Sequence, residues 1–199
     1  MSKSELIKRS GWAFIAGSLA FATILTNSDP LAIPGSMISA LLLAVGMLSL
    51  RTGYGETVSR SGRNILLSGA VGAVLWDMVL VSLIAMSSSG SLHATHAQGQ
   101  RFWIVVFGGP AVALLALTLF GLTALYTKPV SRLNGLSIFA GIWYSAVYLF
   151  LFVYLISHNG VLPDPYWPLV KFTFAMQFLA LFLFGVVLVT DAPQEMATA

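Results

Sequence analysis

The residue that stands out first for its chemistry is Asp77, an acidic side chain inside a long apolar run. Counted from Ile65, it lies about 18 Å along a helix, near the middle of a bilayer. A carboxylate at that depth costs several kcal/mol unless it is paired, protonated or hydrated. Gln177, Tyr144 and Tyr148 match its depth on other runs. We therefore expect a neutral, protonated Asp77 that hydrogen-bonds to one of them, either as a proton or cation site or as a structural link.

Three histidines form a second candidate site, outside the apolar runs. His93 and His96 are spaced so that two imidazoles face one side of a helical turn, and His158 lies in a later polar segment. Such a set can hold a metal ion. The serine-rich residues 87–91 before it are typical of a flexible loop, in which solvated histidines need no ligand. A haem between the helices is disfavoured because no histidine lies within an apolar run.

Other signatures of catalysis are missing from the sequence. With no cysteine, the chain cannot form disulfides, thiolate metal sites or iron–sulfur clusters. No Gly-x-Ser-x-Gly motif and no glycine-rich phosphate loop with a lysine occurs. The sequence thus favours a protein that is not an enzyme. It indicates no cofactor, with a metal, a quinone or a pigment left open.

The composition identifies the elements that must position these residues. Hydrophobic residues make up 57% of the 199, charged residues only 9%, and the mean hydropathy is +0.87. A soluble domain carries about 25% charged residues, so soluble enzymes, nucleic-acid binders and disordered chains are excluded. Six apolar runs predict an all-α bundle of six transmembrane helices, and the short connections make residues 1–199 a single domain. The predicted helices span residues 11–26, 31–50, 65–87, 102–126, 133–157 and 166–190.

The distribution of Lys and Arg predicts the orientation of these helices. Eight lie in the N-terminal segment and in the second and fourth connections, and only Arg101 and Lys171 lie on the other side. Positive residues collect on the cytoplasmic side, so we expect both termini there and a plasma (inner) membrane location. The net charge of +3 is then a topology signal, and no nucleic-acid partner is expected. The first run also resembles a signal peptide, but the next run follows it almost at once, which favours retention.

The apolar runs also carry signals for helix packing. Small residues four apart, such as Gly69 and Ala73, allow close approach of helices in lipid. Pro110, after Gly108 and Gly109, predicts a kink in the fourth helix. Aromatic rings on several faces of the last two helices predict contact with lipid, a partner protein or an apolar ligand.

These features lead us to expect a non-catalytic accessory or structural subunit of a larger membrane complex. Its partners would be the bilayer and either another membrane protein or further copies of the chain. One alternative is a small solute or ion transporter with a midplane site around Asp77. A second alternative is a metal-dependent enzyme at the outer membrane face, built on the three histidines.

Overall fold

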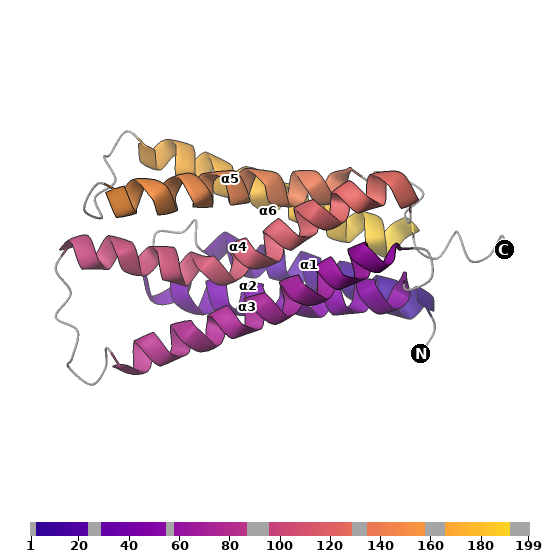
Figure 1. Ribbon diagram of the computed structural model, residues 1–199, viewed down its shortest axis with the longest axis horizontal. Coiled ribbons are helices and arrows are strands. Elements are labelled where there is room, and N and C mark those ends of the chain that lie inside the picture. The colour runs from indigo at the N-terminus through magenta and orange to yellow at the C-terminus, as the bar shows by residue number, and fades with distance from the viewer. Residues whose placement is uncertain are drawn as a thin grey trace.

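The computed structural model describes residues 3–23, 29–54, 58–86, 96–128, 135–157 and 166–191, and six α-helices form nearly all of this part of the chain (Figure 1). The predicted all-α class and the number of helices are confirmed. The helices are α1 (Lys3–Ala22), α2 (Asp29–Gly53), α3 (Arg60–Met86), α4 (His96–Thr127), α5 (Leu136–Ser157) and α6 (Trp167–Asp191).

Five helices, α2 to α6, are long and apolar enough to cross a membrane. Their apolar stretches have 19 to 26 residues, and about 20 residues span the hydrocarbon layer. The chain is therefore a helical membrane protein. α1 does not meet the same criterion, because Lys8 and Arg9 lie within its first two turns and shorten its apolar part.

The boundaries correct the prediction most clearly at the first helix. It begins at Lys3, well before the predicted start at Gly11, and it ends at Ala22. Residues 24–26 of the predicted run lie outside the described residues. α4 likewise starts at His96, earlier than predicted. The physical reason is that polar residues continue a helix beyond the apolar part, so hydropathy locates the membrane-spanning stretch rather than the helix ends.

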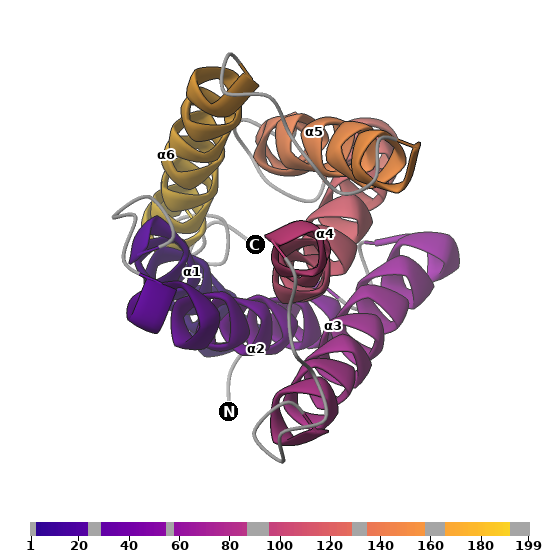
Figure 2. The same ribbon diagram turned by 90° about the vertical axis from the view of Figure 1, so that its left-hand side faces the viewer.

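Five helices form a ring, and the sixth packs on its outside (Figure 2). Around the ring, α1 contacts α2, α2 contacts α4, α4 contacts α5, α5 contacts α6, and α6 returns to α1. α3 contacts α2 and α4 only, among the described residues. The buried core inside the ring contains large side chains such as Phe14, Leu43, Leu117 and Leu181. α4 thus separates α3 from α5 and α6.

Glycines allow the closest helix crossings. A Cβ on Gly11 of α1 would lie 2.6 Å from the backbone oxygen of Gly185 of α6, and a Cβ on Gly185 would lie 2.7 Å from the oxygen of Gly11. Gly141 of α5 packs in the same way on the backbone oxygen of Leu114 in α4. Because lipid offers no hydrophobic driving force between helices, such backbone contacts supply much of the packing energy.

Seven of the nine Lys and Arg residues in the described part of the chain gather at one end of the bundle. The contact of Gly11 with Gly185 places the start of α1 beside the end of α6, and Gly53 at the end of α2 packs on Ile7 of α1 (Figure 1). The start of α3 meets the end of α4, because a Cβ on Gly62 would lie 2.8 Å from Oγ1 of Thr123. This cationic end holds Lys3, Lys8, Arg9, Arg51, Arg60, Arg63 and Lys128, whereas Arg101 and Lys171 lie towards the other end.

Candidate functional site

Asp77 is buried where α3 meets α4 and α2. Its exposed fraction is 5%. A Cβ on Gly109 of α4 would lie 2.8 Å from Oδ1 of Asp77 and 3.1 Å from the Cβ of Ala40 on α2. The carboxyl therefore rests on the backbone of α4. Neither of its oxygens has a hydrogen-bond partner among the described residues, which is rare for a buried polar group.

Two adjacent glycines allow this approach of α3 to α4. The indole ring of Trp76 lies directly over Gly108, and the carboxyl of Asp77 lies over Gly109. Any side chain at either glycine would occupy the space that the α3 side chains now fill. The Gly108-Gly109 pair thus forms the surface of α4 on which α3 packs. Asp77 rests on Gly109, and Trp76 rests beside it on Gly108.

Pro110 follows these glycines and removes one hydrogen bond from α4. Since proline has no N–H, it cannot donate to the carbonyl four residues earlier, which belongs to Val106. The Ser36 hydroxyl of α2 donates to that carbonyl instead, at 2.6 Å. α4 changes direction near its middle, in the region of the helix that contains Pro110 (Figure 1). A buried carboxyl and a weakened turn of helix therefore lie side by side.

Two of the other predicted midplane residues, Tyr148 and Gln177, lie at a similar level along the bundle to Asp77 but on other helices. Asp77, Tyr148 and Gln177 each lie about three turns from the helix end that is away from the cationic end. Gln177 is fully buried on α6, and Tyr148 is half-buried on α5. However, α3 does not contact α5 or α6 within the described residues. Asp77 therefore does not hydrogen-bond to either side chain, and the side chain of Tyr144 is not described.

The three histidines of the predicted metal site lie at the edge of the described residues or outside them. His93 and His158 lie outside the described residues, and His96 is the first residue of α4, with its side chain not described. In the described part of the chain, no group of three or more His, Asp, Glu or Cys side chains could hold a metal ion. The metal site on these histidines remains a prediction.

Sequence reasoning found Asp77 and Pro110 but missed Gly109 as the surface on which Asp77 rests and Ser36 as the hydrogen-bond donor. Proline does signal that the carbonyl of Val106 needs a new donor. The pairing of α2 with α4 that brings Ser36 to it depends on tertiary packing, which hydropathy does not encode.

No protein-family model, no curated protein and no solved structure matches this chain.

Proposed function

We propose that the protein is a small membrane transporter in which Asp77 takes up and releases a proton. The observation that carries this proposal is a carboxyl buried without a hydrogen-bond donor at mid-helix, directly against α4. Among the described residues, the other acidic side chains lie in the first or last turns of their helices. An ionisable side chain deep in a membrane helix is expensive and commonly marks a transport pathway.

The surroundings of Asp77 favour a proton over a metal cation. Hard cations such as Ca²⁺ need six to eight oxygen ligands. The carboxyl rests on the Gly109 backbone, against which the methyl group of Ala40 also packs, and its oxygens have no hydrogen-bond partner among the described residues. A proton needs only the carboxyl itself, and the protonated form is neutral and suits apolar surroundings.

The position of Asp77 also offers a way to couple its charge to movement. An ionised Asp77 would have to find water or a donor, whereas the protonated form can rest on the apolar contact with Gly109. Pro110 interrupts the hydrogen bonds within α4 at this level, and the bond that replaces the lost one comes from Ser36 of α2, so a movement of α4 at Asp77 would also involve α2. Gln177 is buried on α6 and Tyr148 is half-buried on α5, and α4 lies between these helices and α3. With Tyr144, they are the residues that we propose to meet the solute.

The proposed orientation has all six helices spanning the plasma (inner) membrane, with both termini in the cytoplasm and residues 1–199 forming one domain. The gathering of cations at the end that holds the start of α1 and the end of α6 supports this orientation. α1 packs along α2 and α6, and its 20 residues are about 30 Å long, which supports a sixth span.

The transport step is tested in inside-out membrane vesicles that hold a preset pH gradient. Cations, amines, sugars and organic acids are added in turn, and a pH-sensitive dye reports loss of the gradient. We expect at least one solute to dissipate the gradient with the wild-type chain and not with Asp77→Asn. Asp191→Asn, at the last residue of α6, is the matched control and should behave as wild type. Equal responses of Asp77→Asn and wild type would refute the proposal.

The protonation of Asp77 has a readout that needs no solute. Infrared spectra of the purified protein should contain the carbonyl stretch of a protonated carboxylic acid, and Asp77→Asn should lose it. Asp77→Leu separates function from folding, because a carboxyl without a donor is replaced by an apolar side chain of similar size. We expect this variant to unfold no more easily than wild type, while transport is lost.

A second candidate function is the accessory subunit, which the outer face of α5 favours. α5 has the least buried of the five candidate spans, and the aromatic rings of Phe139, Trp143 and Phe150 lie exposed along it. Large aromatic side chains are common where proteins contact one another and where a membrane protein meets the membrane–water interface. Native mass spectrometry of gently solubilised membranes tests this function. A stable complex that Trp143→Ala disrupts would support it, and a monomer under all conditions would exclude it.

A further inference from the structure

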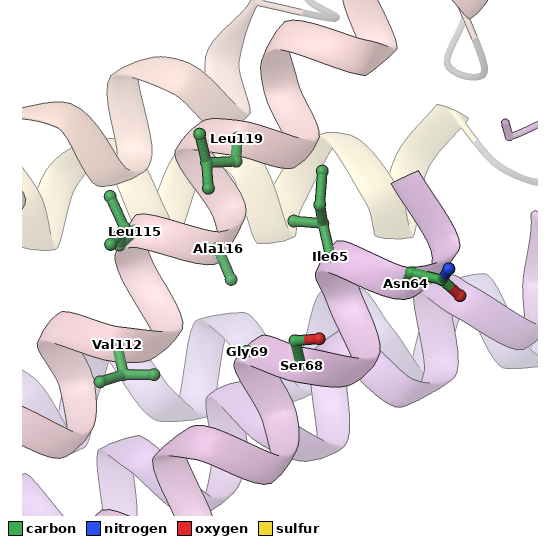
Figure 3. A pocket seen from close by; sticks show the side chains of 8 residues that line it. All are labelled: Asn64, Ile65, Ser68, Gly69, Val112, Leu115, Ala116 and Leu119. Carbon is green, nitrogen blue, oxygen red and sulfur yellow. The ribbon is translucent and has the colours of Figure 1, made fainter. Parts of the chain in front are cut away.

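A groove of about 310 Å³ runs between α3 and α4 on the outside of the bundle (Figure 3). Its floor is narrow, because Gly69 of α3 contacts the Cβ of Ala116 on α4. Val112, Leu115 and Leu119 form its α4 wall. The side chains of Leu115 and Leu119 are exposed, so the groove opens towards the hydrocarbon of the bilayer rather than into the protein.

The polar residues that line this groove come from α3. Ser68 lies beside Gly69 and Asn64 lies one turn further along, at one end of the groove (Figure 3), and both are exposed. Arg60, also exposed, lies one turn before Asn64 on the same side of α3. On α4, Tyr126 follows Leu119 by two turns on the groove face, and it is 89% exposed.

Arg60 and Tyr126 lie at the same level of the bundle. A Cβ on Gly62, near the start of α3, would lie 2.8 Å from Oγ1 of Thr123, near the end of α4. Lys128 follows directly after α4 and is exposed. The apolar groove therefore leads to a cationic and hydrogen-bonding edge at the cationic end of the bundle.

We propose that this groove binds an anionic phospholipid, with one acyl chain along Gly69 and Ala116 and its phosphate at Arg60. The guanidinium of arginine presents several donors that match phosphate oxygens. Asn64 and the Tyr126 hydroxyl supply further donors at the same level. Basic residues beside grooves between transmembrane helices bind anionic headgroups, and the gradient from apolar groove to cationic edge is that of a phospholipid. The site is separate from Asp77, so it stands whether or not the protein is a transporter.

The charge part of the proposal is tested by native mass spectrometry of the purified full-length protein in detergent. The probes are phosphatidylglycerol and phosphatidylcholine with identical acyl chains. We expect the wild-type chain to prefer phosphatidylglycerol and Arg60→Gln to reduce that preference about fivefold. Arg9→Gln is the matched control, because Arg9 is also exposed at the cationic end but lies on α1. Equal binding of the two lipids, or an unchanged preference in Arg60→Gln, would overturn the proposal.

The groove part is tested by filling the groove. Ser68→Phe places a ring in it from an exposed position, and we expect a loss of both lipids. Ser82→Phe, at an exposed serine of α3 outside the groove, should bind as wild type. Unchanged binding by Ser68→Phe would overturn the proposal. So would a Ser68→Cys variant that forms disulfide-linked dimers in bilayers and excludes lipid, because a second copy would then occupy the groove.

Discussion

The Ser36 hydroxyl of α2 donates a 2.6 Å hydrogen bond to the backbone carbonyl of Val106 in α4. That carbonyl is the one that Pro110 leaves without its usual N–H donor. The bond compensates for the interruption of α4 from outside the helix, and it fixes α2 to α4 beside Asp77. Replacement of a lost backbone donor by a serine from a neighbouring helix is a recognised way to tolerate proline in a membrane span.

Ser36→Ala should therefore destabilise the protein. The variant leaves the buried carbonyl of Val106 without a donor, and we expect the free energy of unfolding in mixed micelles to fall by about 1–2 kcal/mol. Ser39→Ala is the matched control one turn along α2. Ser39 is equally buried, but its hydroxyl has no partner in the described part of the chain, so its removal should leave stability unchanged or slightly raised. Equal losses in both variants would contradict this interpretation.

A double-mutant cycle tests the link to proline. In a Pro110→Ala background, the N–H of residue 110 can donate to Val106, so Ser36→Ala should cost less than it does with proline present. We expect an interaction energy of about 1 kcal/mol between the two sites. Strict additivity would mean that Ser36 stabilises the bundle by some other contact.

Gly11 and Gly185 should be the least replaceable pair between α1 and α6. A Cβ on either residue would press on the backbone oxygen of the other, at 2.6 or 2.7 Å, and backbone cannot move aside as a flexible side chain can. We expect Gly11→Ala to lower the free energy of unfolding by about 1–3 kcal/mol. In Gly135→Ala the new Cβ would meet only Leu125 Cδ2, at 3.7 Å, so this control variant should unfold like wild type.

The contact of Gly109 with Asp77 predicts coupling between these residues. Gly109→Ala should destabilise the protein, because its Cβ would lie 2.8 Å from Oδ1 of Asp77. In an Asp77→Ala background this clash is gone, so the same change should cost about 1 kcal/mol less. Gly135→Ala should show no such coupling with Asp77→Ala. Equal costs of Gly109→Ala in both backgrounds would show that the carboxyl does not rest on this glycine.

The sequence predicted the helical class well for a simple physical reason. Long apolar runs have one stable form in lipid, because the backbone must satisfy its hydrogen bonds within the helix. The position of Asp77 along its helix was also predictable, since the rise per residue is constant, and Tyr148 and Gln177 lie at a similar distance from the same end of the bundle; their depth in the bilayer stays a prediction.

Lateral position was not predictable in the same way. Hydropathy indicates the position of a residue along its helix, but it does not indicate which neighbouring helix the residue contacts. The sequence therefore did not reveal that α4 separates Asp77 from Gln177. The predicted start at Gly11 failed for a related reason. The polar residues Lys8 and Arg9 end the apolar run without ending the helix.

The proposed orientation predicts which residues are reached from each side of the membrane. The chain has no cysteine, so single engineered thiols report without background. With both termini in the cytoplasm, Ser61→Cys should react with impermeant reagent from the cytoplasmic side and Tyr166→Cys from the other side. Lys3→Cys and Thr23→Cys, near the two ends of α1, test whether this helix is the sixth span. We expect Lys3→Cys to label with Ser61→Cys, and Thr23→Cys with Tyr166→Cys. If both α1 variants were labelled from one side, α1 would lie along the membrane surface, and the six-span arrangement would be wrong.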